Sequence, residues 1–320
     1  MGGARPDAHG PGREGDPAAV HRRLRPLETI FFGPCHPAFA ARRSVTEMKN
    51  LLGIIGSPRK MGNCELMVKE IAAAIPGSPK LSMVRLAEKD IRPCKACYRC
   101  LTGDCPHQDD FPVVLRAIME ADAVVVAAPA YLRGTHSSLQ RFLDRGLQAY
   151  RHVDSLYGKP AVAVATAGVR DGEGSALLGV ENFIRQLGLS LKGRAVVHAT
   201  FPGDAIVFEE GRSTALLLAA ALVSPEDYVP EGVSCPECKG TYFEFRGRTA
   251  MYCLSCGGTG TFSVINGKAR LEIDPPAHSW RKKEDMALHG KWLIGQRGEF
   301  LRQRERLKEA VKPYLGGEFI

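Results

Sequence analysis

The chain has 320 residues, a formal net charge of +8 and a hydrophobic fraction of 44%. These values describe an ordinary globular protein with one large domain plus attachments, or with two domains, and they exclude a collagen-like or wholly disordered chain. No apolar run approaches the ~18 residues of a membrane-spanning helix, so a membrane protein is excluded. The unusual number is ten cysteines. Because the chain is long and eight of them fall in Cys-x-x-Cys type clusters, a secreted disulfide framework is excluded too.

The first 47 residues differ from the rest. They are rich in Gly, Pro and Arg and have no periodic apolar pattern, which predicts a disordered N-terminal arm. Arg22 and Arg23, followed by small residues at 38–40, loosely resemble an export signal, but residues 24–37 lack a continuous apolar core. We therefore expect a cytoplasmic protein. Translation that starts at Met48, directly before the first predicted strand, is an alternative.

From residue 48 the pattern alternates strand and helix. The predicted strands are apolar almost throughout, which is typical of a parallel sheet covered on both faces. The strands cover residues 51–55, 80–86, 123–128, 161–165 and 189–198, and the helices cover 64–75, 111–119, 137–150 and 175–187. The fold class predicted for 48–222 is doubly wound α/β with five parallel strands. In such sheets ligands bind beyond the carboxyl ends of the strands.

The loop after the first predicted strand reads Gly-Ser-Pro-Arg-Lys-Met-Gly-Asn, from Gly56 to Asn63. It has neither the dinucleotide fingerprint nor the Gly-Lys-Ser/Thr of a triphosphate loop. It offers a hydroxyl, a guanidinium and an amide at the start of a helix, where free N–H groups and the helix dipole favour a phosphate. The alternative is that Gly and Pro simply make the turn and Arg59 is solvated.

Four cysteines lie close together in a loop at residues 92–110. They are Cys94, Cys97, Cys100 and Cys105, and Pro106 follows the last one. Such a run can wrap one compact inorganic core and resembles the cysteine run of bacterial ferredoxins, so we expect all four to hold one [4Fe–4S] cluster. Zinc, whose ligand pairs are usually more widely separated, and redox-active or unliganded thiols are the alternatives.

Two further loops follow predicted strands. Pro129–Thr135 carries an aromatic residue, Tyr131, among small residues, and 166–174 is rich in glycine. An aromatic side chain at a strand end can lie along a flat ring while backbone N–H groups bond its heteroatoms. Alone this signal is weak, because Tyr131 could equally cap the core.

A second cysteine set lies in residues 231–266 and predicts a zinc-ribbon module. Its members are Cys235, Cys238, Cys253 and Cys256, with fourteen residues between the two Cys-x-x-Cys pairs. This spacing indicates tetrahedral ligation by four thiolates. Four thiolates also hold a single iron, so iron is the alternative ion. With no open coordination position, the site is predicted to be structural.

The remaining features receive minor roles. Residues 280–316 predict a long basic helix, and 281–312 carry +5 of the net charge. We expect Cys35 to do nothing and Cys64 to pack or to contact the phosphate; a thiol whose pKa is lowered by the helix dipole is the alternative for Cys64. The carboxylates are read as helix caps or solvated charges, and the histidines as hydrogen-bonding groups rather than proton donors. The residues concerned are Glu65, Asp109, Asp110, Asp144, His107 and His136.

The order of these features resembles the iron–sulfur flavoprotein family, which belongs to the flavodoxin-like NAD(P)H-dependent FMN reductases. The likeness covers roughly residues 48–200 and is carried by the loop at 56–63, the run that opens at Cys94, and Pro129-Ala130-Tyr131. Two departures are that Cys64 stands where the family usually has Thr, and that 128–131 reads Ala-Pro-Ala-Tyr instead of Ser-Pro-Val-Tyr. The zinc ribbon and the basic helix lie outside the likeness.

The resemblance implies FMN, a [4Fe–4S] cluster on the first cysteine set, and a homo-oligomer, a dimer or tetramer, in which clusters and flavins of neighbouring subunits approach. The phosphate is implied at Ser57, Arg59, Lys60, Gly62, Asn63 and Cys64. The flavin ring and ribityl chain are implied at Pro129, Ala130, Tyr131, Leu132, Arg133, Gly134, Thr166, Ala167 and Gly168. No side chain is expected to be catalytic, because the flavin performs the chemistry.

The predicted function is therefore that of an FMN-dependent oxidoreductase. It passes electrons between a reduced donor, NAD(P)H or ferredoxin, and an unspecified acceptor. The ribbon and helix are expected to form a dimerisation element or a cover over the flavin. The alternative function is a nucleic-acid-associated protein with a flavin-binding sensor domain. The interspersed charges of 281–312 support this only mildly, so we do not expect a nucleic-acid partner.

Overall fold

A computed structural model describes residues 48–276 and 282–317 of the chain. The predicted N-terminal arm, 1–47, with Cys35 and the export motif, lies outside the described residues. Within the described part, no helix combines the length and the apolar character that are needed to cross a membrane.

The core is a parallel sheet whose strands are ordered β2-β1-β3-β5-β6, which is 2-1-3-4-5 in order along the sequence and is flavodoxin-like. These strands confirm the five-stranded prediction, and a two-residue strand, β4, adds an antiparallel edge to β3. Their bounds are Asn50–Ile55 (β1), Lys80–Arg85 (β2), Ala123–Tyr131 (β3), Gly134–Thr135 (β4), Pro160–Ala167 (β5) and Ser190–His198 (β6).

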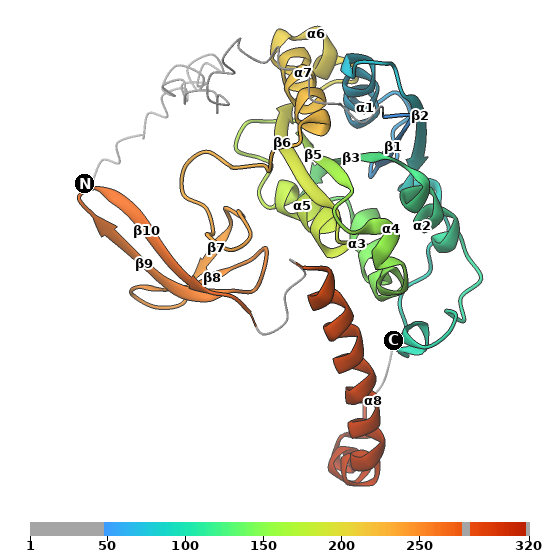
Figure 1. Ribbon diagram of the computed structural model, residues 1–320. Helices are drawn as coiled ribbons and strands as arrows, with labels where there is room; N and C mark the ends of the chain where they lie inside the picture. Colours follow the sequence, from blue (N-terminus) through green and yellow to red (C-terminus); the bar gives the residue numbers. More distant parts are fainter. Residues whose placement is uncertain (1–47, 277–281, 318–320) are drawn as a thin grey trace, which may run out of the picture. The chain divides into compact units, whose positions relative to one another are not determined.

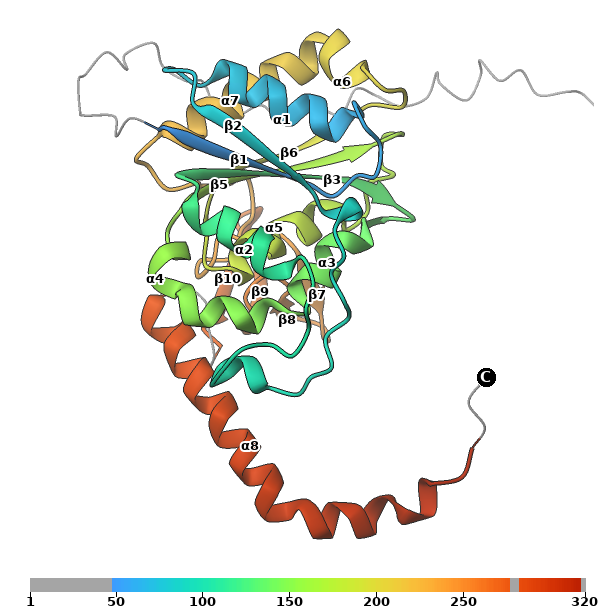
Figure 2. The same cartoon turned by 90° about the vertical axis from the view of Figure 1, so that its right-hand side faces the viewer.

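Helices cover both faces of this sheet (Figures 1 and 2). Because side chains alternate along a strand, Leu52 and Ile54 pack against α2, α3 and α5, whereas Leu51 and Ile55 pack against α1 and α7. The helices of the domain are Asn63–Ala74 (α1), Phe111–Glu120 (α2), Ser137–Leu143 (α3), Val153–Leu156 (α4), Ala176–Gln186 (α5), Asp204–Val207 (α6) and Glu209–Val223 (α7).

The helix predicted over 137–150 is wrong in its second half. α3 ends at Leu143, and the chain continues as the 3₁₀ helix η4, Gly146–His152. Arg145, between them, turns its guanidinium inward to a buried ion pair with Asp109, 36 residues earlier. This tertiary contact overrides the helical periodicity. Two shorter 3₁₀ helices, η2 at Leu86–Glu88 and η3 at Arg99–Leu101, lie in the loop that follows β2.

The C-terminal part contains the predicted ribbon and helix. Four antiparallel strands form a second sheet, ordered β10-β9-β8-β7. They are Phe243–Phe245 (β7), Ala250–Cys253 (β8), Thr259–Ile265 (β9) and Lys268–Asp274 (β10). The long helix α8 spans Lys283–Val311 and ends in the 3₁₀ turn η5, Lys312–Tyr314. Its Met286 is fully buried and lies over Gly188 of the flavodoxin-like domain.

Candidate functional site

Three loops meet at the carboxyl edge of β1, β3 and β5, which are neighbours in the sheet. The first begins at Gly56, whose N–H donates to the carbonyl of Ala127 at 2.8 Å. A Cβ on Gly56 would lie 2.3 Å from Leu139 and 2.9 Å from Ala128, so only glycine lets this loop pass so close to β3 and α3. The sequence order 2-1-3 places the topological switch point here, where this class of sheet binds its ligand.

The N-terminus of α1 closes the first loop. Gly62 precedes the helix and no side chain caps it. The backbone N–H groups of the first turn, at Asn63, Cys64 and Glu65, therefore lack intrahelical acceptors and carry the positive end of the helix dipole. The buried hydroxyl of Ser57 accepts from the N–H of Arg59 at 3.2 Å. These groups together form an anion-binding cradle.

A buried ion pair holds this cradle in shape. Glu65 accepts from Arg85 at 2.7 Å, from Lys69 at 2.7 Å and from the N–H of Met61 at 2.7 Å. Arg85 also donates to the carbonyl of Arg59 at 2.9 Å. Burial alone would raise the pKa of Glu65, but the hydrogen bonds from these cations and from the backbone outweigh it and lower the pKa to about 2.

Asn63, which was predicted to bind the phosphate, uses its side chain elsewhere. Asn63 donates to the carbonyls of Ala199 and Phe201 at 3.2 and 2.9 Å, and its oxygen accepts from Gly203 at 3.0 Å. Its amide thus fixes the loop after β6, and its backbone N–H alone faces the cradle. Arg59 and Lys60, in contrast, are exposed.

Cys64 is buried beneath the cradle. Its Sγ lies 3.2 Å from the Oγ1 of Thr166, at the end of β5, and burial raises the pKa of this thiol to about 11. The side chain is therefore a neutral link between the first and third loops.

The second and third loops are tied to each other. Leu132 and Arg133 have φ values of 49° and 65°, which turn β3 back into β4. The carbonyl of Arg133 accepts from the Ser175 N–H at 2.7 Å, and its guanidinium donates to the carbonyl of Asp171 at 3.4 Å. Leu132 is fully exposed at the tip. The contact with 171–175 was not predicted, because it joins segments about forty residues apart.

Tyr131 lies at the edge of the second loop with 43% of its surface exposed. Its ring meets His136 edge-on, with centroids 5.4 Å apart. His136 caps α3 by accepting from the N–H of Ser138, as a hydrogen-bonding group, and burial lowers its pKa. An exposed aromatic ring beside an anion cradle fits a ligand with a flat ring and a phosphate, although each contact is ordinary alone.

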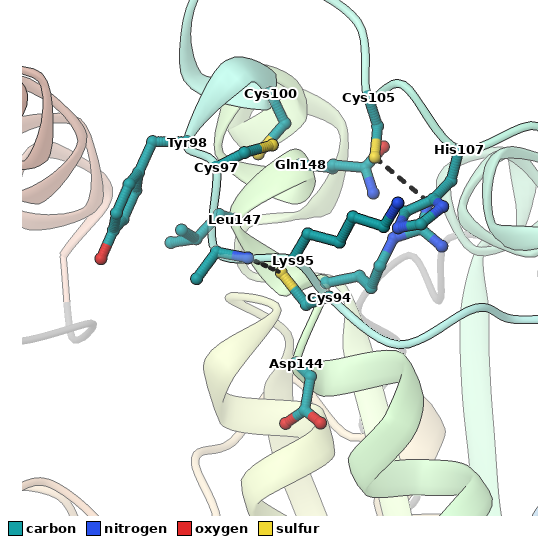
Figure 3. A pocket seen from close by; sticks show the side chains of 12 residues that line it. Cys94, Lys95, Cys97, Tyr98, Cys100, Cys105, His107, Asp144, Leu147 and Gln148 are labelled. Carbon is teal, nitrogen blue, oxygen red and sulfur yellow. Dashed lines mark hydrogen bonds between the residues drawn. The ribbon is translucent and has the colours of Figure 1, made fainter. Parts of the chain in front are cut away.

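The first cysteine set lines one cavity (Figure 3). Its loop is closed at the base, where Asp90 and Asp110 exchange backbone and side-chain hydrogen bonds of 2.8 and 3.0 Å. Ala96 and Tyr98 have left-handed φ values of 48° and 56°, and the N–H of Ala96 points at the Sγ of Cys94, 3.4 Å away. None of the predicted flavin residues lines this cavity. The cavity is lined by Cys94, Cys97, Cys100, Cys105 and neighbouring residues of the loop and of η4.

Sequence reasoning missed the main support of that cavity, Arg145. Its guanidinium is buried, forms an ion pair with Asp109 and donates to the Sγ of Cys105 at 3.5 Å. Burial would raise the pKa of Asp109, but hydrogen bonds from Arg145 and from two backbone N–H groups lower it. Asp109 is therefore not a solvated charge. It does act at the start of α2, where it accepts from the N–H of Phe111 at 3.2 Å.

The second cysteine set is much tighter. The sulfurs of Cys235 and Cys256 are 3.9 Å apart and those of Cys238 and Cys253 are 3.6 Å apart. Four thiolates at tetrahedral zinc, each about 2.3 Å from the ion, stand about 3.8 Å from one another. Among the residues that the structure describes, this is the one group of three or more possible metal ligands whose ligand atoms all lie within 4.8 Å of one another.

The ribbon contacts the flavodoxin-like domain through buried polar groups. Arg185 of α5 donates to the carbonyl of Cys238 at 2.8 Å. The buried carboxylate of Glu181 accepts from Arg194 at 2.6 Å, and Arg194 lies over the ring of Tyr242 at 5.9 Å. Cys238 of the second cysteine set is thus part of the interface.

An anion cradle at a helix start and an exposed aromatic ring on the next strand, in a flavodoxin-like sheet, define the class of FMN-binding oxidoreductases. The model of the family described as NADPH-dependent FMN reductase matches residues 49–201. An iron–sulfur flavoprotein of Archaeoglobus fulgidus is 32% identical over 157 residues, 48% of this chain and 70% of the relative. The chain belongs to the iron–sulfur flavoproteins, its residues 49–201 match the model of the reductase family, and it is an FMN-dependent oxidoreductase.

Two further comparisons agree. An iron–sulfur flavoprotein of Methanocaldococcus jannaschii is 34% identical over 139 residues, 43% of this chain and 68% of the relative. The solved structure of a flavone reductase superposes with a TM-score of 0.61 and covers 85% of this chain and 99% of its own, at 15% identity. At that identity the likeness concerns the fold alone.

Proposed function

We propose that this oxidoreductase carries a [4Fe–4S] cluster on Cys94, Cys97, Cys100 and Cys105 and passes electrons between that cluster and FMN. The observation that carries the proposal is the shared cavity of these four cysteines, in a loop of the same domain that presents the anion cradle. The relatives named iron–sulfur flavoproteins support it.

The sulfur spacing favours a cluster over a single ion. No three of these cysteines have sulfurs within 4.8 Å of one another, whereas the ribbon sulfurs do. A polynuclear core is larger than one ion, so its ligands stand farther apart around it. The N–H of Ala96 and the guanidinium of Arg145 are directed at sulfur, as is common around iron–sulfur clusters.

In the flavin site, the first-turn N–H groups of α1 and the hydroxyl of Ser57 would hold the FMN phosphate. Tyr131, the backbone of Leu132 to Gly134, and the segment from Thr166 to Gly168 would hold the ring and the ribityl chain. FMN supplies exchange of electrons in pairs with one partner and singly with another. The protein's part is to orient the ring and exclude water. The proposed electron transfer requires no side chain that acts as a general base.

We propose that the ribbon cysteines hold a structural zinc ion. Support comes from sulfur separations that match tetrahedral zinc and from the closed set of four thiols. The thiols are close enough to affect one another: hydrogen bonding with Cys235 raises the pKa of Cys238 and lowers that of Cys253. A bound ion would fix Cys238 and with it the hydrogen bond from Arg185.

We further propose NAD(P)H or ferredoxin as electron donor, a dimer or tetramer as the assembly and the cytoplasm as the location. The family's description as NADPH-dependent supports the first of these. The nucleic-acid alternative gains no support from α8, because basic residues of this helix and of η5, which follows it, pair with acids one turn away. Titrating the anaerobic protein with NADH, NADPH and reduced ferredoxin, while following flavin absorbance, identifies the donor.

Metal analysis of two matched variants tests the assignment. After anaerobic purification we expect iron, labile sulfide, zinc and FMN in the parent protein. Cys97→Ala should lose iron and sulfide while zinc and FMN remain, whereas Cys253→Ala should lose zinc while the cluster remains. A parent protein without labile sulfide, or with less than about half an equivalent of FMN per chain, would contradict the proposal.

A further inference from the structure

Arg145 is the largest fully buried side chain of the described residues. It stands between α3 and η4, and its guanidinium lies beside the cavity of the first cysteine set. The ring of Phe111 lies beneath it at 4.8 Å, so one flat side of the guanidinium is covered by an apolar surface. A cation in such a place is costly unless its charge and all its N–H groups find partners.

Those partners are present. One terminal nitrogen contacts the carboxylate of Asp109 and the carbonyl of Arg92, the latter at 3.2 Å. The other donates to the Sγ of Cys105 at 3.5 Å. With the oxygen of its amide turned toward the guanidinium, Gln148 accepts from Nε and from this second terminal nitrogen at 3.1 and 3.2 Å. These contacts hold the guanidinium in one orientation, with one terminal nitrogen at the carboxylate of Asp109 and the other at the sulfur of Cys105.

We propose that the Arg145–Asp109 pair sets the reduction potential of the cluster, with Arg145 stabilising its reduced form through Cys105 and Asp109 limiting that effect. The inference rests on the proposed function, because it needs a cluster on the first cysteine set. Arg145 touches a ligand sulfur rather than a reacting atom, so it is a positioning residue.

The direction of each effect follows from charge. Reduction adds one negative charge to the cluster, and a donor or a cation at a ligand sulfur stabilises that charge, which raises the potential. Removal of Arg145 alone leaves the carboxylate of Asp109, whose side chain is 0% exposed, uncompensated near the cluster, so the potential falls. Removal of the Asp109 charge alone leaves Arg145 uncompensated, so the potential rises.

A purely structural role gives a different pattern. Both residues also anchor the loop: Asp109 accepts from the N–H of Arg92 at 2.9 Å, and Arg145 donates to the carbonyl of the same residue. If anchoring were the whole role, either substitution would loosen the loop and expose the cluster, and both potentials would move in the same direction. Opposite shifts therefore distinguish electrostatic tuning from support.

Arg151 is a matched control. It lies on η4 and also binds the cysteine loop, donating to the carbonyl of Gly103 at 2.7 Å and pairing with Asp104 at 3.1 Å. It is exposed, does not line the cavity of the first cysteine set, and donates to oxygen atoms of Gly103 and Asp104. Arg151→Gln removes an arginine that binds the same loop without removing a donor to Cys105.

The experiment is an anaerobic redox titration of the full chain, followed by the cluster's absorbance and electron paramagnetic resonance. For Arg145→Gln we expect at least a tenfold shift of the cluster toward its oxidised form, a fall of about 59 mV for one electron. For Asp109→Asn we expect a rise, for the double variant a potential between the two, and for Arg151→Gln no shift. In Arg145→Lys, which keeps the charge but not the two terminal nitrogens of the guanidinium, the reduction potential should fall less than in Arg145→Gln.

Each outcome decides one question. Three outcomes would overturn the tuning role and leave a supporting one. They are variant potentials equal to that of the parent protein, shifts of the same sign in the Arg145 and Asp109 variants, and loss of the cluster from all these variants while Arg151→Gln retains it. A parent protein with no iron or labile sulfide would instead overturn the proposed cluster itself.

Discussion

Arg85, the last residue of β2, donates to Glu65 of α1 at 2.7 Å and to the carbonyl of Arg59 at 2.9 Å. The pair joins an edge strand, the first helix and the anion cradle, and both side chains are largely buried. Arg85 therefore helps to set the shape of the anion cradle without belonging to the loop that was predicted to form it.

Replacing Arg85 with Met should weaken FMN binding about tenfold or more and lower the free energy of unfolding by about 2–4 kcal/mol, because Glu65 is left buried with less compensation. Isothermal titration of the apoprotein with FMN and chemical denaturation measure the two effects. Lys69→Met is the control, since Lys69 contacts the same carboxylate from a more exposed position; an equal loss there would argue against a special role for Arg85.

The same carboxylate makes stability depend on pH. The pKa of Glu65 is lowered to about 2 from an ordinary value near 4.5, so the unfolded state binds the proton first as the pH falls. The stabilisation, on the order of 3 kcal/mol, is fully present above about pH 4.5 and is lost as the pH falls toward 2. Unfolding free energies of the parent and Glu65→Gln, measured from pH 7 to 3, should differ most at neutral pH and converge in acid. A constant difference across that range would contradict this assignment.

The five strands could be predicted from sequence because each buried strand is an almost continuous apolar run, such as 123–128. The location of the candidate site could be predicted as well, because in this fold class the loops after such strands form the site. The long-range ion pairs could not. Glu65 with Arg85 and Asp109 with Arg145 join residues 20 and 36 positions apart. Nothing in local periodicity shows which charge will be buried with which, so these carboxylates were read as caps or solvated groups.

The broken helix at Leu143 has the same origin. The apolar pattern of residues 137–150 is helical. The helix ends at Leu143 because Arg145 turns inward to pair with Asp109, and no proline marks the break in the sequence. Asn63 is the converse case: it lies in the predicted loop, yet its amide binds the segment after β6. A motif in the sequence thus located the site, while the direction of each side chain depended on distant segments.

Cys64 should be chemically inert. Burial raises the pKa of its thiol to about 11, so the reactive thiolate is scarce at neutral pH, and the sulfur is also inaccessible. Treatment of the native protein with iodoacetamide at pH 7.5, followed by peptide mass spectrometry, should leave Cys64 unmodified while denaturation makes it reactive. Cys64→Thr should retain FMN, because a hydroxyl can replace the 3.2 Å contact with Thr166. Rapid native alkylation of Cys64 would contradict this prediction.

Metal removal from the ribbon should release it from α5. The Arg185 hydrogen bond ends on the carbonyl of Cys238, so an ion bound by the second cysteine set would fix this residue and with it the interface. In Cys253→Ser we expect zinc to be lost and amide hydrogen exchange to rise at least tenfold in β7, β8 and the part of α5 that contacts the ribbon, because the small module lacks a core large enough to stay folded alone.

Ser255→Ala is the matched control for that variant. It changes a buried side chain between two ligands without removing a sulfur, so zinc content and exchange rates should stay at the parent level. Arg185→Met separates docking from metal binding: zinc should remain, while protection of the interface falls. If Cys253→Ser lost its zinc but kept the parent exchange pattern across α5, the ribbon would be held by the polar contacts of Glu181, Arg194 and Tyr242 alone, and the metal would have no part in docking.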